Sequence, residues 1–131
     1  MSIQSYGAGD ASEKMQSAAF SRESPPPEAF LELVASRFRA LGEPMRLRIV
    51  HALIGGEQSV NALVAKTGAN QANISRHLQT LTRAGILKRR KEGLYVYYRI
   101  ADPGILSLCE YVCGDVKQSQ AEWIQSLGTD S

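Results

Sequence analysis

The spacing of apolar residues changes abruptly at Gly85, and this change constrains the fold more than any other feature of the 131-residue chain. Before this glycine, Ile74, Leu78 and Leu81 recur at the spacing of one helix face. After it come a basic stretch, a Glu-Gly dipeptide and the β-branched and aromatic run Leu94–Ile100. These signals predict a helix that is followed directly by a β-hairpin with glycine at its turn.

Further helices are predicted from the same apolar spacing and from capping residues. The predicted helices run from Pro27 to a stop at Gly42, from Pro44 to the Gly55-Gly56 break, from an N-cap at Ser59 through Thr67, from an N-cap at Asn70 to Gly85, and from Pro103 through about Gly114, resuming through Trp123 and Leu127. Two helices joined by a tight turn that contains glycine are typical of a helix-turn-helix. The order α-α-α-α-β-β-α predicts a mainly α winged helix-turn-helix with a small β-hairpin.

The segments outside this pattern lack the apolar content that an ordered core requires. Residues 1–26 are rich in Ser, Ala and Gly and end in a Pro-rich spacer, so we expect a disordered N-terminal tail. The expected domain covers residues 27–127, and residues 128–131 are expected to form a disordered C-terminus. No window approaches the roughly 18 apolar residues of a membrane span, and the chain does not begin with a secretory signal. A cytoplasmic location without membrane contact is therefore expected.

The formal net charge of +2 conceals two regions of opposite sign. Residues 28–101 carry twelve Lys and Arg against five Glu, which is a net charge of +7. Residues 102–131 carry one Lys against five Asp and Glu, which is a net charge of −4. A basic surface on a small domain favours a polyanion as partner, although a solvated basic face would carry the same charge.

The helix that follows Asn70 divides into an apolar and a polar face. Steps of about 100° per residue from Ile74 put Ala72, Arg76, Gln79 and Arg83 on the exposed arc. Donors and acceptors near a helix N-terminus are what base edges and phosphates in the major groove require. The DNA-binding residues predicted on this helix are Asn70, Gln71, Ala72, Asn73, Ser75, Arg76 and Gln79. The alternative is an ordinary amphipathic surface helix whose polar residues are only solvated.

Four consecutive basic residues before the hairpin turn complete the predicted DNA-binding set: Lys88, Arg89, Arg90 and Lys91. Strand alternation sends two of them to each face of the hairpin. Such charge suits the phosphate backbone or the minor groove, where affinity depends on salt more than on sequence. Basic residues on a strand can instead protect an exposed edge from aggregation, which is the alternative interpretation of this stretch.

Residues 38–53 and 69–100 read FRALGEPMRLRIVHAL and ANQANISRHLQTLTRAGILKRRKEGLYVYYRI. Both stretches resemble the ArsR-type (ArsR/SmtB) winged helix-turn-helix repressors, which sense metals, metalloids or thiol-reactive species, and the resemblance covers about residues 30–116. It implies a homodimer paired through its first and last helices, which binds an inverted-repeat operator and releases it when an inducer binds. The family's DNA-contact positions fall on Gln71, Ala72, Ser75 and Arg76, and Ala72 departs from the usual Ser. His77 matches a common His of the family, for which helix packing, DNA contact and ligand binding all stay open.

The resemblance also implies where known sensing sites of the family would lie. The arsenic-type site is a Cys-x-Cys near the start of the first recognition-motif helix, and residues 58–63 contain no cysteine. The zinc-type positions fall on Asp102, Gly104, Asp115 and Gln118, and of these only Asp102 keeps the family's ligand. Neither site is expected to form as the family builds it.

Cys109 and Cys113 are the remaining candidates for metal or redox sensing. They lie one helical turn apart on one face, and two thiolates bind soft metals or metalloids, such as arsenite or antimonite, when further ligands complete the site. A disulfide within a regular helix is strained, so oxidation would distort the helix or link two chains. Alternatively, the cysteines pack as small hydrophobic residues in a stripe with Ile105, Leu108, Val112 and Val116.

The sequence predicts a sequence-specific, DNA-binding transcriptional repressor of ArsR type, released from its operator by a thiophilic metal, a metalloid or thiol oxidation. Its expected partners are double-stranded DNA and a second copy of the chain, and no cofactor is required. The alternatives are a constitutive winged-helix DNA-binding regulator with structural cysteines and a winged-helix module that binds protein. An enzyme is not expected, because no nucleophile-base pair, metal triad or phosphate loop is recognisable.

Overall fold

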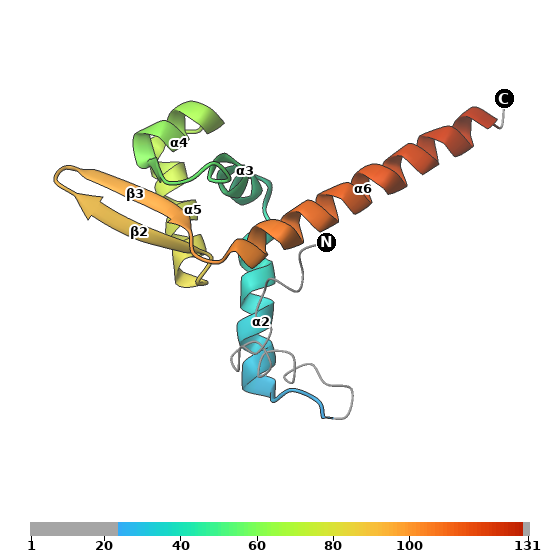
Figure 1. Ribbon diagram of the computed structural model, residues 1–131, viewed down its shortest axis with the longest axis horizontal. Helices are drawn as coiled ribbons and strands as arrows, with labels where there is room; N and C mark the ends of the chain where they lie inside the picture. Colours follow the sequence, from blue (N-terminus) through green and yellow to red (C-terminus); the bar gives the residue numbers. More distant parts are fainter. Residues whose placement is uncertain (1–23, 130–131) are drawn as a thin grey trace. The chain divides into compact units, whose positions relative to one another are not determined.

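The computed structural model describes residues 24–129, whose elements follow the order α2-α3-β1-α4-α5-β2-β3-α6 (Figure 1). The chain divides into two compact units, residues 1–36 and residues 37–131. Helix α2, Glu28–Leu41, spans this division, so residues 28–36 belong to the first unit and residues 37–41 to the second. Most of the predicted N-terminal tail, residues 1–23, lies outside the described residues.

Within the second unit, helices α3, α4 and α5 contact one another. Their bounds are Pro44–Ala52, Val60–Thr67 and Gln71–Arg83. The predicted N-caps of α4 and α5 are confirmed, because Ser59 Oγ accepts a hydrogen bond from the Ala62 amide at 3.1 Å and Asn70 Oδ1 accepts one from the Asn73 amide at 2.8 Å. Gly68 ends α4 with a φ of 74°, a left-handed conformation that favours glycine. The turn between the two helices is therefore determined by local sequence at both of its ends.

The hydrophobic core lies between these helices and the sheet. The largest completely buried side chains include Leu63 of α4 and Ile74, Leu78 and Leu81 of α5. Tyr98 of the sheet and Ile105 of α6 are also buried in the same cluster. The helical period thus correctly predicted which face of α5 is held inside the domain.

The wing is the antiparallel hairpin of β2, Leu87–Glu92, and β3, Tyr95–Ile100, which turns at Gly93 with a φ of 62°. A short strand β1, Gln58–Ser59, pairs with β3 on its other side, so the sheet order is β1-β3-β2. Strand β1 was not expected from the sequence. Two residues are too few to show an alternating pattern, and Ser59 carries the separate signal of a helix cap.

Helix α6, Pro103–Thr129, is one uninterrupted helix (Figure 1). This corrects the expectation of a helix that ends at about Gly114 and resumes later. Glycine in a helix interior costs only about 1 kcal/mol relative to alanine, so Gly114 weakens the helix without ending it. The helix continues beyond the predicted domain end at residue 127, and residues 130–131 lie outside the described residues.

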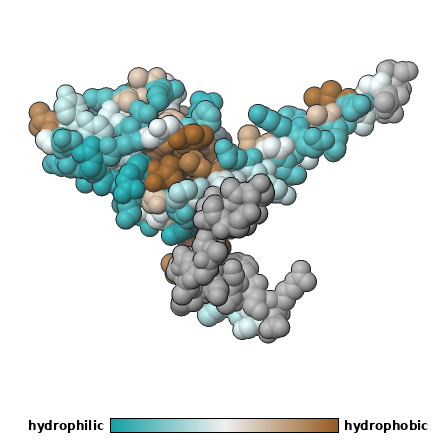
Figure 2. Space-filling view, in the orientation of Figure 1, coloured by the Kyte–Doolittle hydropathy of each residue, from teal (hydrophilic) through white to brown (hydrophobic). Residues whose placement is uncertain are grey.

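Only the first turns of α6 pack against the core. Ile105 is buried and Leu106, Leu108 and Cys109 are partly buried, whereas every residue from 110 to 128 is exposed. Figure 2 shows apolar side chains gathered where α6 begins and again toward its far end. Despite its length, α6 lacks the apolar character of a membrane span, as do the other helices within residues 24–129.

Candidate nucleic-acid interface

The polar face of α5 is open to solvent along the whole helix. The exposed side chains on it are Gln71, Ala72, Arg76, Gln79 and Arg83. Asn73 and Ser75 are half-buried at the margins of this face, as the helical period predicts. The face offers amide and guanidinium groups, which are the groups that recognise base edges in the major groove.

The first turn of α5 orients Arg76. Arg76 Nη2 donates a hydrogen bond to Asn73 Oδ1, and the Asn73 amide donates to the capping Asn70 Oδ1. Arg76 is exposed, so this bond holds its guanidinium against the helix while leaving it open to solvent. Asn70 and Asn73, both predicted DNA contacts, therefore also stabilise the first turn of α5 and the orientation of Arg76.

An open groove of about 430 Å³ separates α5 from the wing. It is lined by Gln71, Ser75, Gln79, Thr82 and Arg83 of α5, by Arg89, Val96 and Tyr98 of the wing, and by Val60 of α4. None of these described lining residues is acidic, whereas two are arginines. The groove is therefore positively charged, and the surface over the wing and its surroundings is mainly hydrophilic (Figure 2).

Arg83 belongs to this groove although the predicted contact set stops at Gln79. The helical period does place Arg83 on the exposed arc of α5, so a signal for it is present in the sequence. Its proximity to Arg89 depends on how the wing folds back beside the helix, which helical periodicity cannot show. The structure thus adds a cation to the predicted surface.

Strand pairing divides the four basic residues of β2 between two faces, as alternation predicts. Arg89 and Lys91 are on one face, and Lys88 and Arg90 are on the other. Arg89 pairs with Tyr98, and both residues line the groove. The two faces of the wing therefore have different environments.

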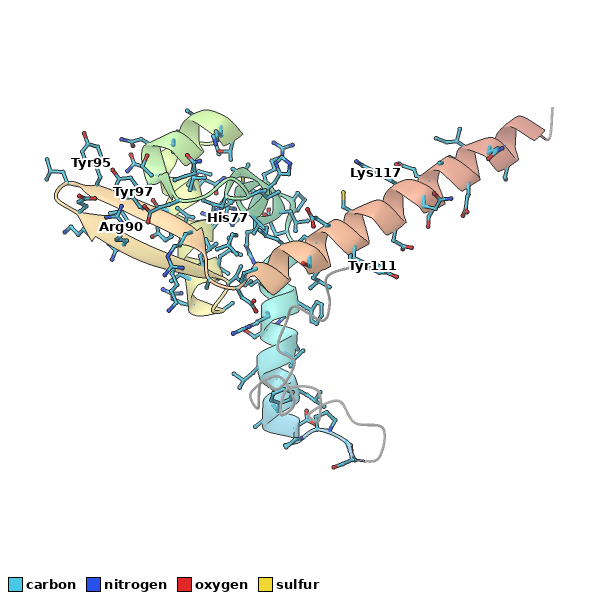
Figure 3. All side chains as sticks on the ribbon, in the orientation of Figure 1. His77, Arg90, Tyr95, Tyr97, Tyr111 and Lys117 are labelled. Carbon is cyan, nitrogen blue, oxygen red and sulfur yellow. The ribbon has the colours of Figure 1, made fainter. Side chains whose placement is uncertain are left out.

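Arg90 is bound to carboxylates on the face away from the groove (Figure 3). Its Nε and Nη2 donate to Glu57 Oε2 and Oε1 at 3.0 and 2.8 Å, and its Nη1 donates to Glu92 Oε1 at 2.7 Å. The guanidinium carbon lies 4.6 Å from the centre of the Tyr97 ring. The hydrogen bonds with both carboxylates raise the pKa of Arg90, and the bond from Arg90 lowers the pKa of Glu57. The charge of Arg90 is thus paired with two carboxylates of the same chain.

His77 lies on the inner side of α5 and is buried (Figure 3). Its Nδ1 accepts a hydrogen bond from Arg46 Nε at 3.1 Å, and its Nε2 lies 4.0 Å from Glu43 Oε1. Arg46 Nη1 also donates to the carbonyl oxygen of Ala40 at the end of α2, at 3.1 Å. Of the roles that the sequence left open for His77, the structure supports packing, since the side chain joins α5 to the start of α3.

Known proteins resemble this chain in both sequence and structure. A helix-turn-helix domain family matches residues 41–90. The transcriptional regulator Rv0324 of Mycobacterium tuberculosis is 39% identical over 80 residues, which are 61% of this chain but only 35% of that protein. A probable mercury resistance operon repressor of Streptomyces lividans is 31% identical over 77 residues, which are 59% of this chain and 62% of that protein.

The family is decided by a solved structure from Mycobacterium bovis, the homodimeric winged helix-turn-helix DNA-binding domain of Mb0332, described as a possible ArsR-family transcriptional regulator. It matches with a TM-score of 0.65 and 35% sequence identity, over 70% of this chain and 85% of that domain. This chain belongs to the ArsR/SmtB family. It is a DNA-binding transcriptional regulator of winged helix-turn-helix fold, which confirms the resemblance found in the sequence.

In this ArsR-family regulator, Cys109 and Cys113 are free thiols one turn apart on α6. Cys109 is half-buried against the core and Cys113 is exposed, so the packing alternative fits the first cysteine better than the second. Burial, and to a smaller extent Cys113, raises the pKa of the Cys109 thiol. Within residues 24–129, no three His, Cys, Asp or Glu side chains come together to hold a metal ion.

Proposed function

We propose that this chain is a homodimeric, sequence-specific transcriptional repressor that binds an inverted-repeat operator through α5 and the wing. The observation that carries the proposal is the exposed polar face of α5 beside a groove with two arginines and no carboxylate. A recognition helix reads base edges with its N-terminal residues, while neighbouring cations hold the phosphates. In this proposal Gln71 and Arg76 read bases, and Ser75, Arg89 and Lys91 bind the DNA backbone.

Exposed apolar residues along α6 support the homodimer. Tyr111, Trp123 and Ile124 are 76%, 63% and 59% exposed, and Val112, Val116 and Leu127 are also exposed. Large apolar side chains that are exposed in a monomer often mark an interaction surface, and pairing of two copies through their first and last helices would cover them. The Mycobacterium bovis relative is described as homodimeric, and a two-fold symmetric dimer matches an inverted repeat.

Selection of binding sites from random duplex DNA, followed by mobility-shift titration of the selected site, tests this function. Arg76→Ala should raise the Kd for the selected site by roughly 5- to 150-fold for each half-site, the range expected for losing one base-specific arginine contact, and should change the Kd for random DNA much less. Lys117→Ala is the matched control, because it removes a cation from α6, and it should leave both Kd values unchanged (Figure 3). Failure to select any sequence, or wild-type affinity in Arg76→Ala, would contradict the proposal.

The proposal includes an inducer that acts at Cys109 and Cys113. Two thiols one turn apart supply two ligands, and where arsenite, antimonite or a thiophilic metal ion takes a trigonal or tetrahedral site, the remaining ligands would come from the second copy. The relative from Streptomyces lividans is named as a mercury resistance repressor, which supports a thiophilic inducer. Binding displaces thiol protons, and because the pKa of Cys109 is raised, inducer affinity should increase with pH.

Release of DNA by arsenite, cadmium or an oxidant should be lost in the double variant Cys109→Ser with Cys113→Ser. DNA affinity without inducer should stay unchanged, because neither cysteine lines the groove. A double variant that still responds would show that the cysteines have no sensing role. If the wild type responds to none of these reagents, the second candidate function holds, a constitutive regulator, which the half-buried position of Cys109 favours.

A further inference from the structure

The outer face of the wing is tied to the helix-turn-helix through a single arginine. Arg90 of β2 forms two parallel hydrogen bonds with Glu57, at 2.8 and 3.0 Å. Glu57 directly precedes β1, and Ser59 at the end of β1 caps α4, the first helix of the helix-turn-helix. The ion pair therefore joins the wing to the segment from which α4 starts, across 33 residues of sequence.

We infer that Arg90 and Glu57 are positioning residues that set the orientation of the wing relative to α4 and α5, and that Arg90 does not bind a DNA phosphate. This inference rests on the proposed function, because it concerns how well the wing is placed for DNA. It replaces the expectation that all four basic residues of β2 contact the backbone.

The surroundings of Arg90 and Arg89 differ in a way that supports this assignment. Arg90 has three of its nitrogens bonded to Glu57 and Glu92 and lies over the ring of Tyr97. A phosphate would have to displace these bonds and approach two carboxylates, which repel it. Arg89 lies on the opposite face, in a groove with no carboxylate among its described lining residues. Arg89 is thus suited to binding a phosphate, whereas Arg90 is suited to holding the wing in place.

The ion pair can influence wing orientation even though its members are partly exposed. Isolated surface ion pairs contribute little to stability, but a bidentate arginine with a second carboxylate and an aromatic ring is more strongly constrained. Strand β1 pairs with β3 at only two positions, Gln58 with Tyr98 and Ser59 with Tyr97. Few backbone bonds therefore connect this segment to the wing, and Arg90 adds a side-chain link where the ladder is shortest.

Glu57→Gln distinguishes a positioning role from simple repulsion of DNA, because the two predict opposite signs. If Glu57 only repels phosphates, neutralising it tightens binding to every duplex. If Glu57 positions the wing, affinity for the selected site falls by about three- to five-fold for each copy of the chain, the effect of one constrained ion pair, and affinity for random DNA, whose phosphates the wing also contacts, does not rise. Mobility-shift titration with both duplexes measures the two effects in one experiment, and tighter binding to both would overturn the inference.

Arg90→Lys and Arg90→Gln separate positioning from phosphate binding. Lysine keeps the charge but cannot form the bidentate pair, so both variants should lose site affinity to a similar extent. Arg89→Gln is the matched comparator, and it should reduce the slope of log K against log salt by about 0.9 for each copy of the chain, the value for one phosphate contact. An Arg90→Gln slope change as large as that of Arg89→Gln, together with wild-type affinity in Arg90→Lys, would overturn the inference. The exchange Glu57→Arg with Arg90→Glu should recover affinity relative to either single change.

A measurement without DNA keeps this inference separate from the proposed function. Backbone ¹⁵N relaxation of the free protein reports the mobility of residues 88–97 relative to α5. Glu57→Gln and Arg90→Lys should lower the order parameters of the wing and leave those of α5 unchanged, whereas Arg89→Gln should alter neither. Wing order parameters that stay at the wild-type level in both positioning variants would overturn the inference even if the protein selects an operator. Looser wings in a protein that selects no DNA would leave the ion pair's structural role intact and reject the repressor function.

Discussion

Helices α5 and α6 differ in how much of each is held by the domain to which they belong. In α5, the stripe of Ile74, Leu78 and Leu81 is completely buried along the helix while the opposite face is polar and open. In α6, only the first turns touch the core, and the exposed remainder still carries large apolar side chains such as Trp123. The position of α5 is therefore determined within one chain, whereas residues 110–128 of α6 are exposed to solvent.

The regions of the chain that contain α5 and α6 also differ in net charge. The region that contains α5 and the wing has a net charge of +7, and residues 102–131 have a net charge of −4. An anionic partner such as DNA is attracted to the first region and repelled by the second. The basic region that contains α5 is thus suited to DNA, whereas the exposed part of α6 is suited to apolar contact.

The largest expected effect is on folding. Leu78→Ala in α5 should reduce the free energy of unfolding by about 2–5 kcal/mol, because it leaves a cavity in the core. Val116→Ala in α6 removes exposed carbon atoms and should change the free energy of unfolding of the monomer by less than about 0.5 kcal/mol. Urea unfolding at protein concentrations low enough to disfavour self-association measures both. Equal losses in the two variants would mean that Val116 contributes as much to the folded monomer as a core residue of α5.

The next effect is on self-association. Trp123→Ala should weaken dimerisation by about 2 kcal/mol, or roughly 30-fold in Kd, if Trp123 is an anchor of the interface between two copies. Sedimentation equilibrium measures the change, and far-ultraviolet circular dichroism checks that α6 stays helical. Lys117→Ala on the same helix serves as control. A Trp123→Ala dimer as tight as the wild type would mean that this part of α6 has no role in pairing.

The smallest effect is on thiol reactivity. At neutral pH Cys113 should react with iodoacetamide faster than Cys109, because Cys113 is exposed and the pKa of Cys109 is raised by burial. As the pH rises through the Cys109 pKa, the reactive thiolate of Cys109 becomes populated, so the reaction rate of Cys109 should approach that of Cys113. Because the pKa of Cys109 is higher in the folded protein than in the unfolded chain, the folded protein binds the thiol proton more tightly. The protonated Cys109 therefore makes a small contribution to stability, which is present at lower pH and is lost as the pH rises through this pKa. Both cysteines lie in one tryptic peptide, residues 100–117, so fragment ions from tandem mass spectrometry are needed to assign the modification to each thiol. A ratio of the two rates that is independent of pH would remove burial as the cause.

Features that depend on neighbours in sequence could be predicted well. Ser59 and Asn70 signal helix starts because their side chains bond amides three residues ahead, and the buried stripe of α5 follows from helical geometry alone. The hairpin turn at Gly93 and the division of the β2 cations between two faces also follow from local rules. Identification of α5 as the candidate reading helix rested on these local patterns.

Features that join distant segments could not be predicted in the same way. Strand β1 exists because Gln58 and Ser59 meet β3, some forty residues later. Helix α6 continues through Gly114 because the rest of the helix outweighs the cost of one glycine. A prediction that treats each glycine as a helix stop overestimates the effect of Gly114. The burial of Cys109 but not Cys113 depends on where α6 leaves the core.

The order of the helices and the hairpin, the exposed polar face of α5 and the basic character of the wing could all be predicted from the sequence, because each arises from interactions within a few residues. The tertiary structure was needed to show that Arg83 and Arg89 line one groove while Arg90 is bound to Glu57 and Glu92 on the opposite face. What an arginine can bind depends on the groups that surround it. Those groups are brought together by the fold and lie as far as 33 residues apart in the chain.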